Sequence, residues 1–280
     1  MLKTKLLLGA FLIINLYGTE LRSVVLCFDD AYYSVYKYGY PLLKEYQLPI
    51  TLGVITNYLD RMPYPRKSAN PYQFMNVGEI KEMQKNLKIE IASHSVSHRN
   101  LTRLSEQEIK FELERSKQIL DSTFAEPTVT FIYPYGYFDD RVIKLVKETN
   151  YLLARAVLYG EPNFWVDRYK LAVKEIRKET TVHEVINFII SHKNTVLLLH
   201  RLAPNPKVFT EWSVDNFSAL LKYLKSDNNI QVVTLKGLYY LWCQENLLTL
   251  IRNSLAENYH ILFQKVDVDQ TRTYNSSLIK

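Results

Sequence analysis

Short apolar runs alternate with amphipathic stretches along the chain from Ser23 onward. The apolar runs are rich in β-branched residues and predict strands at Val24–Phe28, Ile50–Val54, Ile89–Ala92, Thr128–Ile132, Leu152–Val157, Thr195–Leu199 and Gln231–Thr234. The intervening stretches predict helices at Val77–Lys85, Ser105–Thr123, Asp139–Thr149, Thr181–His192 and Val214–Lys225. Ser105 and Thr181 each stand three residues before a glutamate, which is the capping-box pattern of a helix start.

Strands that alternate with helices build parallel sheets, because the helix carries the chain back to the same end of the sheet. Seven such strands with no break in composition predict an α/β protein with a single distorted (β/α)7-type barrel. We expect this domain to occupy residues 19–245, with a helical extension and loose tail at 246–280.

The first 18 residues have the order of a secretory signal or N-terminal anchor. Lys3 and Lys5 precede an apolar run from Leu6 to Leu16, which is short for a membrane span. Leu16 is a poor residue two places before a cleavage site at Gly18, so an uncleaved anchor stays open. We expect export to the periplasm, cell envelope or medium, with membrane proximity through this segment, against the alternative of a buried first helix.

Composition narrows the partners only slightly. A net charge of +6 and a pI near 9.0 favour an anionic partner without choosing one. The lysines and arginines are scattered and no stacking motif frames them, so we expect no nucleic acid. The 21 tyrosines suit a sugar-binding groove, although most are expected to pack. Two distant cysteines, Cys27 and Cys243, predict no disulfide framework.

Two strand ends carry residues suited to a metal site. Asp29 and Asp30 follow the first strand, where two like charges need a cation or water nearby. His94 and His98 follow the third, at a spacing that lets both imidazoles reach one ion. Together with Asp30 they form a ligand group that leaves coordination positions open for catalysis. Taken singly, these patterns also fit a strand-end cap and a polar loop.

Two further strand ends have candidate chemistry. The run FIYPYG at 131–136 enters a turn whose backbone amides can stabilise an oxyanion, although an ordinary turn has the same residues. The run LLLH ends at His200, which can supply a proton or can be a satisfied core histidine. All four positions are at the carboxyl ends of strands, where such barrels place their active sites.

The ordered set FDD, HSVSH, YPYG and LLH resembles the polysaccharide deacetylases, the NodB-like family also called carbohydrate esterase family four. The resemblance covers roughly Ser23 to Leu241. It implies a distorted barrel, a divalent metal that is usually zinc, and an acetylated sugar or polysaccharide as substrate. It also implies roles for named residues: Asp29 as general base, Asp30, His94 and His98 as metal ligands, His200 as general acid, and the Pro134–Tyr135 turn in oxyanion and substrate binding.

The sequence departs from the family pattern at several flanking positions. Cys27 and Ala31 replace the usual threonine and glycine, and Arg201 stands where an acidic residue is frequent, a change expected to alter substrate preference or slow the enzyme. Ile132 replaces an arginine that normally helps to set the acidity of the base. We consider Lys174 as its substitute and Asp167 as a residue that orients His200, against the alternative that both are solvated surface charges.

The expected activity is therefore hydrolysis of N-acetyl groups by metal-activated water. The same fold also allows an O-acetyl esterase, an amidase for small molecules, and a silent carbohydrate-binding relative. The altered motif flanks keep the silent relative open.

Overall fold

The computed structural model describes residues 21–59, 70 and 73–251. The chain divides into two compact units, one ending at Leu238 and one starting at Tyr239. In the second unit, residues 239–251 are helical and the ring of Tyr239 stacks on Trp242, with centroids 5.8 Å apart. The predicted leader and most of the tail lie outside the described residues. No described helix is long and apolar enough to cross a membrane.

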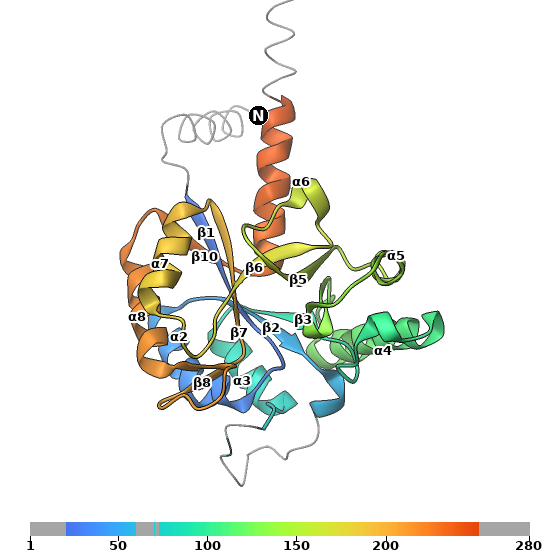
Figure 1. The fold of residues 1–280 in the computed structure, drawn as a ribbon, viewed down its shortest axis with the longest axis horizontal. Helices are drawn as coiled ribbons and strands as arrows, with labels where there is room; N and C mark the ends of the chain where they lie inside the picture. Colours follow the sequence, from blue (N-terminus) through green and yellow to red (C-terminus); the bar gives the residue numbers. More distant parts are fainter. Residues whose placement is uncertain (1–20, 60–69, 71–72, 252–280) are drawn as a thin grey trace, which may run out of the picture. The chain divides into compact units, whose positions relative to one another are not determined.

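Seven parallel strands form a closed barrel in the first unit (Figure 1). They are β1 (Arg22–Phe28), β2 (Ile50–Val54), β3 (Ile89–Ser93), β4 (Thr130–Ile132), β5 (Leu153–Tyr159), β6 (Leu171–Glu175) and β7 (Asn194–Leu199). Closure comes from β1 and β7, which pair in parallel from Ser23↔Asn194 to Phe28↔Leu199. The predicted barrel is confirmed.

Helices surround the barrel. They are α2 (Tyr40–Tyr46), α3 (Val77–Asn86), α4 (Glu106–Phe124), α5 (Asp140–Glu148), α6 (Phe164–Asp167), α7 (Val182–Ser191) and α8 (Val214–Ser226). A π-helical turn η1 (Val35–Gly39) precedes α2, and short 3₁₀ turns occur at η2 (Thr56–Tyr58), η3 (Leu101–Arg103) and η4 (Pro134–Gly136). Both predicted capping boxes are present, at Ser105 and Thr181, and Asn76 caps α3 in the same way.

The identity of one barrel strand differs from the prediction. The apolar run at the end of the series forms β10 (Ile230–Val233), which pairs with the first half of β1 outside the closed ring. The sixth ring strand is β6, which was not predicted. Its sequence LAVKE has only five residues, two of them charged. Because only the four-residue α6 separates it from β5, no helical period marks a crossover. Two short strands, β8 (Arg201–Ala203) and β9 (Glu211–Ser213), pair separately.

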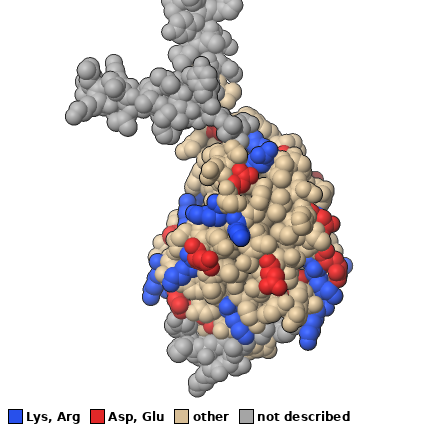
Figure 2. All heavy atoms as spheres, turned by 90° about the vertical axis from the view of Figure 1, so that its left-hand side faces the viewer, with Lys and Arg blue, Asp and Glu red and all other residues tan. Residues whose placement is uncertain are grey.

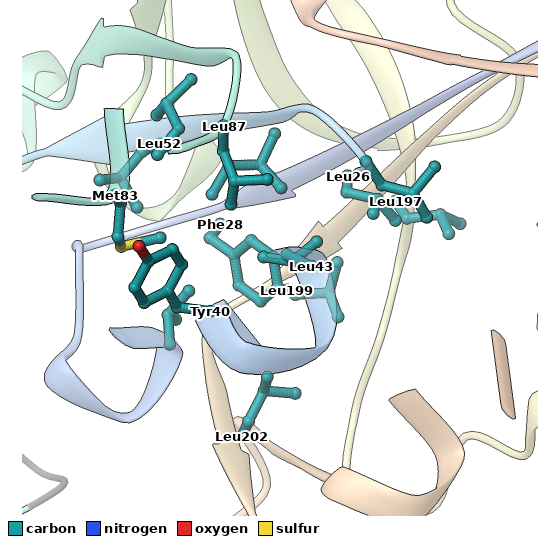
Figure 3. Close-up of a cluster of buried hydrophobic side chains, with 14 of the residues drawn as sticks. Leu26, Phe28, Tyr40, Leu43, Leu52, Met83, Leu87, Leu197, Leu199 and Leu202 are labelled. Atoms are coloured by element: carbon teal, nitrogen blue, oxygen red, sulfur yellow. The ribbon is translucent and has the colours of Figure 1, made fainter. Parts of the chain in front are cut away.

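Alternation along the strands separates the helix-covered layer from the barrel interior. Leu26 and Phe28 of β1 pack with Leu199 of β7 and with Leu43 of α2 in the main apolar cluster (Figure 3). Burial of each large apolar side chain contributes roughly 1.5–3 kcal/mol. Cys27 lies between Leu26 and Phe28, so its side chain points the opposite way, into the barrel interior. Asp29, two residues after Cys27, faces the same way. The strand therefore delivers Asp29 to the carboxyl end of the barrel from inside.

A buried carboxylate links β2, β3 and β4 to the helical segment that begins at residue 235. Glu90 of β3 accepts hydrogen bonds from the hydroxyls of Thr51 and Thr130 and, at 2.7 Å, from the backbone N–H of Lys236. Its side chain is 3% exposed. Each donor would lose a partner if the carboxylate were removed.

Glu90→Ala should therefore lower the free energy of unfolding by about 1–3 kcal/mol, because buried hydroxyls and an N–H lose their acceptor. Glu90→Gln keeps one acceptor oxygen and should lose less. Urea unfolding followed by circular dichroism measures both. Equal stability of the alanine variant and the wild type would show that this cluster is not a stabilising contact.

Candidate metal and catalytic site

Asp30, His94 and His98 converge at the carboxyl ends of β1 and β3. The two histidine Nε2 atoms are 3.1 Å apart, and each is 3.5 Å from Oδ1 of Asp30. These are the three residues whose ligand atoms form a possible metal-binding group in the described part of the chain. The predicted ligand set is thus brought together in space.

The donor geometry fits a metal ion. Two nitrogens bound tetrahedrally at about 2.0–2.1 Å from one ion lie about 3.3 Å apart, close to the separation of the two histidines. His94 Nδ1 lies 2.8 Å from the carbonyl oxygen of Ile132. A proton on Nδ1 satisfies this carbonyl and leaves the Nε2 lone pair directed at the site. Burial lowers the pKa of His94 to about 3, so the imidazole is in the neutral form that binds metals.

The backbone around the ligands is left-handed at four non-glycine positions. The φ angles are 67° at Asp30, 53° at Ala31, 66° at Ser95 and 59° at His98. Such conformations cost roughly 1 kcal/mol or more each, and they persist where the surrounding structure compensates for them. Here they turn the chain sharply enough to direct all three side chains to one point.

Glu112 of α4 holds the loop between the two histidines. Its carboxylate accepts hydrogen bonds from the backbone N–H groups of Val96, at 2.8 Å, and Ser97, at 2.9 Å, and from the Ser97 hydroxyl. The side chain is buried. The loop that spaces His94 and His98 is therefore fixed from behind by a charge that sequence reasoning missed.

Asp29 pairs with a buried arginine from another strand. Nη2 of Arg155 donates to both carboxylate oxygens of Asp29, and Arg155 is fully buried. Arg155 of β5 is the register partner of Ile132 of β4, the position where the family pattern has its arginine. A guanidinium thus reaches Asp29, the expected base, from the strand next to β4, whereas Lys174 lies over the Tyr159 ring.

The charges of the site set the ionisation of the two aspartates. Burial would raise the pKa of Asp29, but the Arg155 guanidinium, His94 and His200 together hold this pKa below its usual range. Burial and the Asp29 charge raise the pKa of Asp30 to about 7. A cation bound by Asp30 would offset that repulsion.

His200 and Asp29 line one cavity. Asp167 and Lys174, the two residues considered as supports in the sequence, do not contact His200. The His200 Nδ1 atom is buried and has no hydrogen-bond partner among the described residues. Asp167 instead accepts from the Tyr169 backbone N–H and lies 3.5 Å from Lys170 Nζ, so it does not orient His200. Lys174 lies over the Tyr159 ring at 5.5 Å, while its neighbour Glu175 lines the cavity.

The Pro134–Gly136 turn forms one wall of the site. Tyr135 has φ 59°, and its ring contacts His98 edge-on with centroids 4.5 Å apart. Gly136 has φ 72°, and a Cβ atom there would lie 2.4 Å from Val157 Cγ2, so only glycine fits. The predicted turn therefore borders the metal ligands.

These residues line one cavity of about 500 Å³, which we call the main cavity. The cavity is also lined by the rings of Tyr58 and Phe74, stacked with centroids 4.1 Å apart, and by Tyr32, stacked on Phe74 at 5.0 Å. The Arg201 guanidinium lies 3.9 Å over the Tyr32 ring. Tyr58 and Phe74 flank the proline-rich stretch, most of which lies outside the described residues.

Arg155→Met should lower the free energy of unfolding by about 3–5 kcal/mol, because it leaves the Asp29 charge buried without a partner. Asp29→Asn in the same chain should recover part of this loss, since the double variant has no unpaired charge. A double-mutant cycle measured by urea unfolding tests the coupling. Strictly additive effects of the two substitutions would contradict a direct pair.

Glu112→Ala should weaken metal binding by about 10–100-fold, because the histidine loop loses its three hydrogen bonds. Zn²⁺ titration against a competing chelator measures this directly. Glu114→Ala, an exposed residue on the same helix, is the matched control and should bind metal as the wild type does. Equal affinity of both variants would remove Glu112 from the metal site.

Comparison with known proteins agrees with this geometry. The family pattern described as Polysaccharide deacetylase matches residues 17–154. A Bacillus subtilis (strain 168) protein named provisionally as a polysaccharide deacetylase is 29% identical over 130 residues, 46% of this chain and 43% of its own. The poly-beta-1,6-N-acetyl-D-glucosamine N-deacetylase of Staphylococcus aureus (strain MRSA252) is 29% identical over 135 residues, 45% of each chain. The chain thus matches less than half the length of these curated relatives.

A solved structure extends the similarity of fold to most of the chain. The peptidoglycan deacetylase of Bacillus subtilis superposes with a TM-score of 0.55 at 20% identity, covering 83% of this chain and 97% of that one. The matched sequence pattern includes Asp29, Asp30, His94, His98 and the Tyr135 turn. The part of the chain that carries these residues, 17–154, therefore matches the polysaccharide deacetylase family over just under half of the sequence.

Proposed function

We propose that this chain is a metal-dependent hydrolase that removes N-acetyl groups from an acetylated sugar or polysaccharide, with zinc as the metal. The observation that carries the proposal is the approach of Asp30, His94 and His98 to one point, in a cavity that Asp29 and His200 also line. Three protein ligands leave open coordination positions, as in catalytic rather than structural metal sites. The names of the relatives supply the class of substrate.

Asp29 is suited to be the general base. A divalent metal in this site would act as a Lewis acid, polarising the acetyl carbonyl and acidifying a bound water. The Arg155 guanidinium keeps the Asp29 carboxylate ionised despite burial, so it can take a proton from the attacking water. The new bond joins the water oxygen to the acetyl carbon.

His200 is suited to protonate the departing nitrogen. Burial lowers its pKa to about 4, so the imidazole is neutral before substrate binds. It takes up one proton from solvent to become the acid, and Asp29 returns the proton it took from water to the solvent when the products leave. Negative charge that develops on the attacked carbonyl oxygen stabilises an imidazolium nearby, which raises the pKa when the proton is needed. The carbon–nitrogen bond then breaks, and acetate and a free amine leave. We assign to the backbone N–H of Tyr135, which follows Pro134, a hydrogen bond that stabilises the negative charge on the acetyl carbonyl oxygen.

The proposal includes export of the protein and a polysaccharide rather than a nucleic acid as its partner. An acetylated cell-surface polymer lies outside the membrane, in agreement with the signal-like order of residues 1–18. On the face drawn in Figure 2, basic and acidic side chains are interspersed among the described residues. A phosphate backbone is held by a continuous basic surface, so this face does not favour nucleic acid.

Zinc-loaded protein should release acetate and an equal amount of free amine from N-acetylglucosamine oligomers, and chelation should abolish the reaction until zinc is restored. Asp29→Asn should lower kcat at least 100-fold, the size of a general-base contribution. Its metal content, measured by mass spectrometry, should stay that of the wild type.

The products separate the alternatives. Acetate without a matching amine from O-acetylated glycans would show an esterase. Bound glycan with no acetate from any substrate of the panel would show a silent carbohydrate-binding relative. Glu114→Ala serves as the control substitution, since this residue is exposed on α4.

A further inference from the structure

A second cavity lies beside the main one. It has a volume of about 460 Å³ and is lined by Arg99, Asn100, Arg103, Leu104, Tyr135 and Tyr137. We call it the side cavity. Tyr135 and Tyr137 line both cavities, so the two are neighbours across these rings. A chain-like ligand with one residue at the metal ligands would extend over the tyrosines into the side cavity.

The two tyrosines have the form of a sugar platform. Their rings stack with centroids 6.2 Å apart at an angle of 29°. Tyr135 is 59% exposed and Tyr137 56% exposed. A ligand that covers these rings would remove apolar surface from water, which favours binding. The contact between Tyr135 and His98 fixes one end of this platform next to the metal ligands.

The nitrogen groups of the side cavity are all hydrogen-bond donors. The Asn100 side-chain oxygen accepts hydrogen bonds from the backbone N–H and the hydroxyl of Thr102. Its side-chain NH₂ group is therefore the part that can donate to a ligand. Arg103 is exposed, with no ion pair among the described residues. No carboxylate lines this cavity in the described part of the chain.

Arg99 is the one lining cation with a partner. Its Nη2 donates to Glu108 at 3.0 Å, with both side chains about half exposed. Exposed pairs of this kind contribute about 0–1 kcal/mol, so a ligand can compete for the guanidinium. A guanidinium fork matches the planar geometry of a carboxylate.

We propose that the side cavity binds the neighbouring residue of the same polysaccharide chain, and that this residue carries a carboxylate recognised by Arg103 and Arg99. The inference rests on the proposed deacetylase function and narrows its substrate to acidic acetylated polysaccharides. Tyr137 binds the sugar ring, and the arginines distinguish the acidic residue from a neutral one.

The test compares two ligands that differ only in charge. One is a tetrasaccharide of alternating N-acetylglucosamine and lactyl-substituted N-acetylglucosamine, and the other is its methyl ester. Calorimetry on the zinc-loaded Asp29→Asn chain should show about tenfold tighter binding of the acid than of the ester at low salt. The ratio should shrink as salt is raised.

Substitutions assign the effect to residues. Arg103→Gln should reduce the ratio of affinities severalfold, and Arg99→Gln combined with it should bring the ratio to about one. Tyr137→Ala should weaken both ligands alike. Arg115→Gln, an exposed arginine of α4 outside the cavity, should change neither. The same ratio should appear in kcat/KM of the otherwise unaltered wild-type chain.

The outcomes separate this inference from the proposed function. Equal affinity for acid and ester, or an unchanged ratio in the double arginine variant, overturns the carboxylate site even if acetate is released. Discrimination in binding with no acetate release from any glycan supports the site and overturns the deacetylase proposal.

Discussion

The carboxylate of Asp29 is buried at the mouth of the barrel, and an unpaired charge there would cost several kcal/mol. Arg155 compensates this cost from β5, three strands away around the closed ring through β7 and β6. The arrangement keeps Asp29 ionised, and interactions with His94 and His200 also favour its charged form. Barrel closure is what allows β1, β3, β5 and β7 to contribute to one small volume.

Much of the site could be predicted because it follows strand ends. Asp29, His94, the Tyr135 turn and His200 each come directly after a strand with a clear apolar signal, and carboxyl ends of parallel strands meet at one edge. His94 and His98 are four residues apart in one loop, so their shared approach to a metal could be predicted from the sequence alone. These predictions needed no knowledge of which strands are neighbours.

The residues that were missed depend on pairing between distant segments. Arg155 lies within an apolar strand and gains its meaning only from its register with Ile132. Glu112 sits on α4 among exposed acidic neighbours such as Glu114, and nothing local distinguishes the buried one. Likewise β6 has too few apolar residues to show a strand by itself, although the ring requires it. The expectation that many tyrosines pack rather than bind sugar fits Tyr33, Tyr36 and Tyr40. Tyr36 stacks on the other two, and none of the three lines the main cavity.

The pairing of β1 with β7 has a consequence for the order in which the protein can form. β1 is made first, yet its closing partner ends at Leu199, so the contact joins segments separated by about 170 positions. The two histidines and Asp30 emerge early, whereas Arg155 and His200 emerge late. During synthesis the chain therefore carries Asp30, His94 and His98 well before β7 is present to close the barrel around them.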